Sequence, residues 1–364
     1  MRNFSNSHRV VIKIGTNLLT KEGKFNIQYV HEISSQIAGL KNRGLQVLLV
    51  SSGAIGMGAA ELNLKNRVKD IKMRQACAAI GQPLLMHQYR DSFGKYGLSI
   101  AQVLVTREVF SNRTTFLNLK NSVETLLTLG IIPIFNENDS VSTDEIGSAF
   151  GDNDRLSAMI ASKVDADLLI ILTDIDGLYN GDPRKNSDVS LISSVEEITD
   201  EVLAYAGSEG SEFSTGGMKT KLQAVTIAAN AGCKTILAHG GKPGILNKLI
   251  NGDKVGTVFL AGKKLSARSR WILNSVPLGQ INIDPGALTA LRNKKSLLPS
   301  GVSSVEGVFA EGDVISINGI ANAVSKFTST DIENILGYHS KEIPNLLGKG
   351  KKDVIARSED IIFL

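Results

Sequence analysis

The chain has 364 residues, of which 42% are hydrophobic, and a formal net charge of +4. At ~100–200 residues per domain, this length predicts two domains, and so small a charge does not require a nucleic-acid partner. Two cysteines, Cys77 and Cys233, stand at no metal-ligand spacing and indicate a reducing compartment. Because there is no apolar run of ~18–20 residues and no signal-peptide pattern, we expect a cytoplasmic protein with no membrane partner.

Short apolar runs alternate with amphipathic segments along the first 240 residues. Strands are predicted over residues 9–15, 46–52, 99–106, 130–139, 166–179 and 234–240, and helices over 27–42, 69–95, 113–129, 154–164 and 218–232. Such alternation predicts βαβ units, and hence a mainly parallel sheet with helices on both faces. Ligands of these sheets bind at the carboxyl ends of the strands, where the polar, glycine-rich clusters of this chain also lie.

The pattern changes near residue 262. Residues 263–278 are basic and end in Pro-Leu-Gly, which is typical of a linker. Beyond them, short alternating runs with frequent turns predict a small all-β module. We therefore expect a first domain over 1–262, a linker over 263–278 and a β module over 279–357.

Two early clusters suit a phosphate group. Lys13 stands in an apolar strand, where an ammonium group is costly unless an anion pairs with it, although an edge-strand lysine that reaches solvent explains it equally well. The stretch SSGAIGMG (51–58) could present backbone N–H groups to an anion. It is not the dinucleotide fingerprint, because Glu61 stands where the third glycine belongs, and it could equally be an ordinary glycine turn.

A later cluster, STGGMKTK (214–221), precedes a predicted helix and carries two lysines. The helix macrodipole disfavours lysines at that end, so their presence favours a bound polyphosphate, although the chain has no P-loop motif. The segment 172–184 follows a strand with Thr173 and Asp174. An ordinary turn explains that segment as well, since Asp-Gly and Asp-Pro both form turns.

The stretch NENDSVSTDEIGSAFGDNDRL (136–156) gathers carboxylates and amides. A solvated loop, a cap for the following helix or a metal site could each account for part of it. Capping needs one or two residues only, and no histidine or known metal-ligand spacing is present. A polar pocket for a small zwitterion remains, since carboxylates can face its ammonium group and amides its carboxylates.

Taken in order, these motifs resemble those of the amino acid kinase family. The motifs that carry the resemblance are VIKIGTNLLT, VSSGAIGMG, RQACAAIGQ, QVLVTREVF, GIIPIFNENDSV, FGDNDRLSA, LTDIDGLY and STGGMKTKLQA. They are most similar to those of the glutamate 5-kinase branch, and the segment after residue 280 resembles the PUA module found in many of its members. The resemblance implies a three-layer αβα sandwich followed by a C-terminal PUA domain, and transfer of the γ-phosphoryl group of ATP to the side chain of L-glutamate, the first step of proline biosynthesis.

The resemblance also implies roles for individual residues. Lys13 and Lys221 would hold the phosphates and the transferring phosphoryl group, and Asp154 would orient both lysines. The residues implied to bind glutamate are Ser52, Gly53, Asn136, Asp139, Asp152 and Asn153. Those implied to bind ATP, besides Lys13, are Thr173, Asp174, Thr215, Gly216, Gly217, Met218, Lys219, Thr220 and Lys221. Mg²⁺ would accompany ATP, held mostly by phosphates and water, so no protein metal ligand is expected.

Partners follow from the same resemblance. It suggests feedback inhibition by proline, a dimer or tetramer, and a reductase that accepts the labile acyl phosphate. Two other functions remain open: another acid kinase of the same family, and RNA binding through the PUA module, for which the basic stretch 345–358 could contact phosphates. A dinucleotide dehydrogenase is disfavoured by the incomplete glycine fingerprint.

Overall fold

The structure is a computed structural model of the chain. It describes all residues except 1, 3, 5, 22–23, 65, 67, 107–108, 111–112, 142–152, 183–187, 207–216, 340–341 and 348–352, and omits the side chains of 113, 344 and 345. The chain forms two compact units. Unit 1 comprises Met1–Val109 and Thr114–Lys264, and unit 2 comprises Phe110–Arg113 and Leu265–Leu364.

Unit 1 is built on an eight-stranded sheet in the order β5-β6-β4-β1-β7-β9-β10-β8. All neighbouring strands are parallel except β9 and β10, which are antiparallel. The strands are β1 (Arg9–Ile14), β4 (Gln46–Val50), β5 (Ile100–Val105), β6 (Ile132–Glu137), β7 (Leu168–Thr173), β8 (Ser194–Val195), β9 (Lys234–His239) and β10 (Thr257–Phe259), with a separate hairpin of β2 (Thr20–Lys21) and β3 (Lys24–Phe25).

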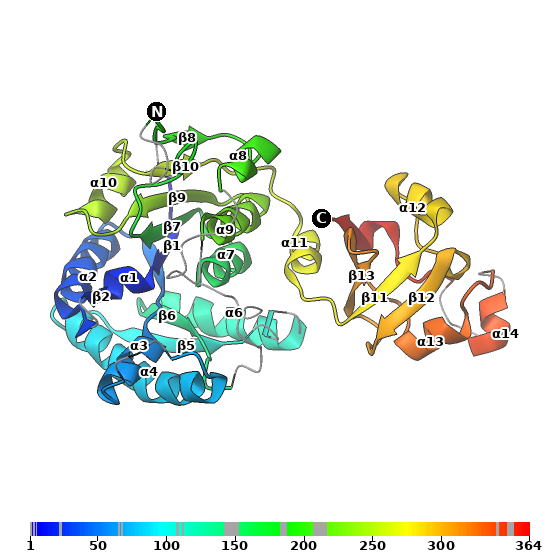
Figure 1. The fold of residues 1–364 in the computed structure, drawn as a ribbon, viewed down its shortest axis with the longest axis horizontal. Helices are drawn as coiled ribbons and strands as arrows, with labels where there is room; N and C mark the ends of the chain where they lie inside the picture. Colours follow the sequence, from blue (N-terminus) through cyan, green and yellow to red (C-terminus); the bar gives the residue numbers. More distant parts are fainter. Residues whose placement is uncertain are drawn as a thin grey trace. The chain divides into compact units, whose positions relative to one another are not determined.

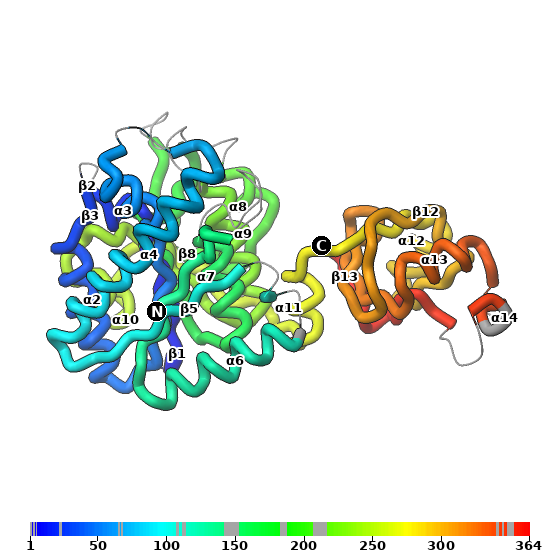
Figure 2. The backbone as a smooth tube through the Cα atoms, turned by 90° about the horizontal axis from the view of Figure 1, so that it is seen from below, coloured from blue at the N-terminus to red at the C-terminus, as the bar shows by residue number. Residues whose placement is uncertain are grey.

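Helices cover both faces of this sheet. They are α1 (Thr16–Leu19), α2 (Ile27–Asn42), α3 (Ala54–Glu61), α4 (Ile71–Gly94), α6 (Arg113–Thr128), α7 (Asn153–Lys163), α8 (Asp200–Ala204), α9 (Met218–Asn230) and α10 (Ile245–Asn251). Figure 1 and Figure 2 show α2 and α10 on one face of the sheet and α7 and α9 on the other.

The alternation of side chains along β1 determines toward which face of the sheet each residue points. Ile12 and Ile14 are fully buried in the cluster that includes α2, α4 and α10. Lys13, between them, projects to the opposite face, because successive side chains of a strand alternate. That face is covered by α7 and α9 (Figure 1), so an ammonium group is buried beneath these two helices.

Helices α3 and α4 pack with almost no space between their backbones. A methyl group on Gly58 would lie 1.9 Å from the carbonyl oxygen of Cys77, and one on Gly81 would lie 1.9 Å from that of Ala54. Only glycine allows this approach. The glycine-rich run that follows β4 is therefore a helix packed on α4, and its N-cap, Gly53, has a φ of +99°, which favours glycine.

The predicted parallel α/β architecture is confirmed, and each predicted strand and helix of the first 240 residues has a counterpart. The sequence patterns did not predict α1, α3, α8, α10, the β2–β3 hairpin, β8 or the antiparallel β10. Helix α3 was not predicted because Gly56 and Gly58 weaken the helical pattern of its sequence. Its stability comes from packing on α4, and this long-range contact leaves no local signal.

Unit 2 is a strand-rich module with a five-stranded sheet in the order β12-β11-β13-β14-β15. Neighbouring strands are antiparallel except β11 and β13. Its elements are α11 (Ala267–Asn274), β11 (Gly279–Ile283), α12 (Pro285–Arg292), η1 (Pro299–Gly301), β12 (Val302–Gly307), β13 (Val314–Ile317), β14 (Ala321–Val324), α13 (Ser329–Asn334), α14 (Ile343–Leu347), η3 (Ser358–Asp360) and β15 (Ile361–Phe363).

The module differs from the expected all-β module by its short helices. Helix α12 begins with a recognisable signal: Asp284 caps it by accepting a hydrogen bond from the Ala287 N–H at 2.7 Å, and Pro285 occupies the first turn. Helix α11 lies within the predicted linker, and its Ile272 is buried with Val314 and Val324. The exact domain boundaries stay a prediction.

Candidate active site

Several of the predicted site residues lie at one edge of the sheet of unit 1. Strands β6, β4, β1 and β7 are consecutive neighbours and parallel, so their carboxyl ends share that edge. Lys13 lies next to the last residue of β1, Ser52 follows β4, Asn136 lies near the end of β6, and Thr173 ends β7. The fold thus gathers residues that are up to 160 positions apart in the sequence, because 173 and 13 differ by 160.

Three charged side chains form a buried cluster there, the Lys13–Asp154–Lys221 triad. Lys13 Nζ lies 2.6 Å from Asp154 Oδ1, and Lys221 Nζ lies 2.8 Å from Asp154 Oδ2. The exposed fractions of the three side chains are 2%, 0% and 6%, respectively. One carboxylate thereby fixes two ammonium groups, although helix capping could have explained this acid from the sequence. A pair of fixed ammonium groups is suited to a bound polyanion.

Lys13 comes from strand β1, and the first turns of two helices supply the other two members of the triad, Asp154 and Lys221. Asp154 lies in the first turn of α7 and Lys221 in the first turn of α9. Gly217 caps α9, and its carbonyl oxygen accepts a 2.8 Å hydrogen bond from the Thr220 hydroxyl. The first turn of α9 holds no acidic residue, so its free N–H groups and its lysines all present positive potential.

A network of buried amides adjoins the triad. Asn153 Nδ2 donates to Asn136 Oδ1 at 2.9 Å, to Ser52 Oγ at 3.1 Å and to the Ser51 carbonyl oxygen. Asn136 Nδ2 in turn donates to Gln82 Oε1 at 2.8 Å. The two ends of the acidic stretch 136–156 therefore meet in space, and Gly53 lies beside them as the cap of α3.

Asp139 follows β6 in a turn and is not joined to the amide network. Burial raises the pKa of its carboxyl group, and the positive charge of Arg74 on α4 partly offsets that effect. A half-buried carboxylate of this kind gains from an ammonium partner, because such a partner stabilises the ionised form.

Thr173 and Asp174 form a smaller group at the end of β7. The Thr173 hydroxyl donates to Asp174 Oδ1 at 3.0 Å, and Asn17 Nδ2 donates to Asp174 Oδ2 at 2.7 Å. Burial alone would raise the pKa of Asp174, but these hydrogen bonds and the charge of Lys221 lower it below its ordinary value. Asp174 is therefore held ionised, with its orientation fixed by Asn17.

The remaining predicted residues divide into two groups. Lys219 is exposed on α9, and Met218 and Thr220 are half-buried there. Asp152, Thr215 and Gly216 lie outside the described residues.

The described residues hold no group of three or more His, Cys, Asp and Glu side chains placed to bind a metal ion. None of the helices in the described ranges combines the length and hydrophobicity needed to cross a membrane.

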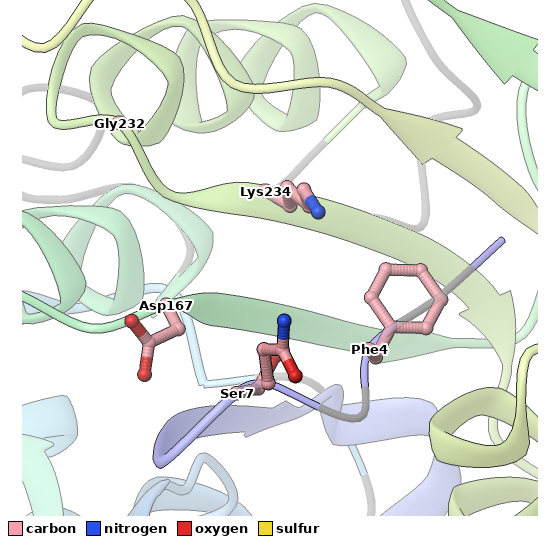
Figure 3. Close-up of a pocket in the computed structure, with 6 residues that line it drawn as sticks. Phe4, Ser7, Asp167, Gly232 and Lys234 are labelled. Carbon is pink, nitrogen blue, oxygen red and sulfur yellow. The ribbon is translucent and has the colours of Figure 1, made fainter.

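A cavity of about 350 Å³ lies at the other edge of the sheet, near the amino ends of β1, β7 and β9 (Figure 3). Its lining residues are Phe4, Asn6, Ser7, Asp167, Gly232 and Lys234. Asp167 accepts hydrogen bonds from the backbone N–H groups of His8 and Arg9 at 2.8 and 2.9 Å, so its carboxylate holds the start of β1 in place. None of the predicted site residues lines this cavity.

Sequence reasoning missed four side chains that contact or influence the predicted site: Asn17, Arg74, Gln82 and Tyr89. Asn17 follows the Lys13 strand directly, so its place could have been inferred from that motif. The other three lie on α4, and Tyr89 reaches Ser51 with an oxygen–oxygen distance of 2.9 Å. The local sequence does not show whether a polar residue on a long helix faces solvent or a binding site.

Comparisons with known proteins identify the family of the chain. The model of the amino acid kinase family matches residues 8–239, and the model of the PUA domain matches residues 279–347. The chain belongs to the amino acid kinase family. A relative from Methanosarcina mazei named glutamate 5-kinase is 41% identical over 98% of this chain and 96% of its own length. Relatives of the same name from Thermoanaerobacter sp. and Geobacter metallireducens are 45% identical, over 98% of this chain and 98% and 97% of theirs.

A solved structure supports the fold. The carbamate kinase of Giardia lamblia bound to AMP-PNP superposes with a TM-score of 0.51 at 16% sequence identity. The match covers 70% of this chain and 99% of that one. At this identity the likeness concerns the fold alone.

Proposed function

We propose that this protein is an ATP-dependent kinase that phosphorylates the side-chain carboxylate of L-glutamate and so catalyses the first step of proline biosynthesis. The product is L-glutamyl 5-phosphate. Support comes from relatives of that activity that match nearly the whole chain, and from a site whose groups suit both reactants. The observation that carries the proposal is the Lys13–Asp154–Lys221 triad at the carboxyl edge of the sheet.

The triad would reduce the electrostatic repulsion between the two reactants. A carboxylate must approach a phosphoryl group that is itself negative, so catalysis needs alignment and neutralisation of charge. Lys13 and Lys221 would supply two fixed positive charges, and Asp154 would hold both in place. The attacking carboxylate is ionised at neutral pH, so the reaction needs no general base.

The acid substrate would occupy the side of the site formed by the amides. Ser52, Gly53, Asn136 and Asn153 surround this side, and Asp139 lies beyond β6. Glutamate presents an ammonium group and two carboxylates, which fit a mixture of acceptors and donors. The raised pKa of Asp139 is consistent with a carboxylate that gains its counter-charge from the substrate.

The nucleotide would occupy the other side. The start of α9, from Gly217 to Lys221, would face the phosphates, and Thr173 with Asp174 would contact the nucleoside. Thr215, Gly216 and Lys219 would extend the phosphate contacts, and Asp152 those with glutamate. Mg²⁺ would enter with ATP and neutralise phosphate charge, bound mostly by phosphates and water.

One assay tests the function. The protein is incubated with ATP, Mg²⁺, hydroxylamine and L-glutamate, and glutamyl hydroxamate is measured. We expect product with L-glutamate and little with L-aspartate or N-acetyl-L-glutamate. Product with one of the latter acids and none with glutamate would replace the substrate by another of the same family.

The wider partners follow from the same proposal. Proline resembles cyclised glutamate, so we expect it to inhibit by competing for the acid pocket. Inhibition that excess glutamate does not relieve would contradict a shared pocket. A reductase would accept the labile product, and the enzyme would work as a dimer or tetramer in the cytoplasm. RNA binding by the module of unit 2 stays a separate prediction, tested by titration with single-stranded and duplex RNA.

A further inference from the structure

Gln82 lies on α4 and joins the amide network through Asn136. Only 7% of the residue is exposed. Its Oε1 accepts the 2.8 Å hydrogen bond from Asn136 Nδ2, and its Nε2 points to Gln102 Oε1 at 3.4 Å. A buried side chain with both ends in contact with partners has a single favourable orientation.

The orientation of Asn136 is fixed by its own backbone. Its Oδ1 accepts a 3.0 Å hydrogen bond from the Glu137 N–H, which can only donate. The amide nitrogen of Asn136 must therefore point the other way, toward Gln82. Because Asn136 is 3% exposed, that nitrogen needs a protein acceptor, and Gln82 Oε1 is the one in place.

Asn153 is oriented by the same logic. The Ser51 carbonyl oxygen, which can only accept, faces Asn153 Nδ2, and Asn136 Oδ1 and Ser52 Oγ face it too. Three acceptors surround a nitrogen with two protons, so the nitrogen has no capacity left for a ligand. Among the described residues, Asn153 Oδ1 receives no hydrogen bond, and this oxygen is the atom left to bind a donor.

We propose that Gln82 is a positioning residue for the acid substrate: it holds Asn136, and through it Asn153, so that Asn153 presents an oxygen to the ammonium group of glutamate. This inference rests on the proposed function. Gln82 itself would not contact the substrate. Its effect would therefore fall on glutamate binding and leave the nucleotide side unaffected.

The position of Gln82 is itself constrained. Its neighbour Gly81 lies against the carbonyl oxygen of Ala54, so α4 cannot shift relative to α3. Tyr89 lies seven residues further along the same face of α4 and contacts Ser51 Oγ. One helix thus fixes both sides of the amide network, Asn136 through Gln82 and Ser51 through Tyr89.

The substitution Gln82→Met tests the inference, because methionine keeps the length of the side chain but cannot accept the hydrogen bond from Asn136. We expect the KM for glutamate to rise about tenfold, as for one lost buried hydrogen bond, with the KM for ATP unchanged and a smaller effect on kcat. Gln88→Met is the matched control. It makes the same change six residues away on α4, where the side chain takes no part in the network, and should leave both KM values unchanged.

A double-mutant cycle separates positioning from general loss of packing. If Gln82 acts through Asn136, adding Gln82→Met to Asn136→Ala should cause no further rise in the KM for glutamate. Additive effects, or an unchanged KM in Gln82→Met alone, would overturn the inference. Thermal melting of each variant shows whether it folds, and the cycle remains decisive if Gln82→Met is less stable.

The wild-type protein distinguishes failure of the proposed function from failure of the positioning role. If it forms no hydroxamate from glutamate, the proposed function is wrong, and Gln82 has no such substrate to position. If it does so while Gln82→Met behaves like Gln88→Met, the function stands and the positioning role fails.

Discussion

Each unit of the protein holds one buried aspartate between two cations, and the two clusters differ in exposure. In unit 1, the side chains of Lys13 and Lys221 are 2% and 6% exposed around Asp154. In unit 2, Asp360 binds Arg268 and, at 3.2 Å, Lys326, whose side chains are 46% and 16% exposed. The cations of unit 2 retain water, whereas those of unit 1 have lost nearly all of it.

This difference is the one expected between a structural cluster and the proposed phosphate site. Removing ammonium groups from water costs several kcal/mol each, about as much as a good ion pair returns, so folding alone does not favour such burial. The Arg268–Asp360–Lys326 cluster joins α11, η3 and the end of β14 at lower cost. The Lys13–Asp154–Lys221 triad makes sense where a further anion binds, as the proposed function requires.

The strongest test of the comparison removes one cation from each cluster. Lys221→Ala should lower glutamate-dependent turnover by about 100-fold or more, because a fixed charge facing the transferring phosphoryl group is lost. Lys326→Ala, its counterpart in unit 2, should leave turnover within about twofold of the wild type, since surface changes remote from a site act mainly on stability. The hydroxamate assay measures both. Retention of a tenth of the activity by Lys221→Ala would contradict the catalytic role.

The second test concerns stability. Asp360→Asn should lower the free energy of unfolding by about 2 kcal/mol, the usual size for hydrogen bonds to charged groups, reduced by the exposure of Arg268. Urea unfolding measures the loss, and turnover should not change. A large loss of turnover in this variant would mean that the cluster of unit 2 is not merely structural.

A smaller effect is expected at Asp139. Asp139→Asn keeps the shape but removes the charge proposed to face the ammonium group of glutamate. The KM for glutamate should rise about tenfold, with a smaller change in kcat, as for one charge-assisted hydrogen bond. Initial rates at varied glutamate measure this. An unchanged KM would show that the acid pocket does not include Asp139.

The smallest effects are those of pH, and they should follow pKa shifts of opposite direction in the two units. Burial raises the pKa of Asp139 above 3.8, so its ionised form gains population only as the pH rises through that raised value. The KM for glutamate should fall over this range, and Asp139→Asn should abolish that part of the profile. A wild-type KM that stays flat there would argue against an ionised Asp139 in binding.

For Asp360, burial would raise the pKa, but Arg268 and Lys326 lower it below 3.8. Its contribution to stability is therefore complete above the unfolded value and is lost as the pH falls through the lowered one. The difference in unfolding free energy between the wild type and Asp360→Asn should shrink over that acidic range. A difference that persists at the acidic end would mean that packing, not charge, causes it.

Sequence patterns predicted the alternating strands and helices, because each strand and helix carries its own period and end signals. Lys13 shows the limit of prediction from local sequence patterns. Its burial was visible as a lysine in an apolar run, but the choice between a ligand-binding lysine and one that reaches solvent depended on Asp154, 141 positions away (154 minus 13). Gln82 ends the motif RQACAAIGQ, but the motif gave it no role, because its partner Asn136 lies on another element and no local pattern links them.

Asn153 and Asp154 are adjacent residues at the start of α7, and their side chains contact different groups. One reaches the amides of the proposed acid pocket, and the other the lysines of the proposed phosphate site. The two reactants would therefore be located from a single peptide unit. A tilt or shift of α7 would carry both binding points together, and the gap between nucleophile and phosphorus would be less sensitive to such motion than if each point belonged to a separate element.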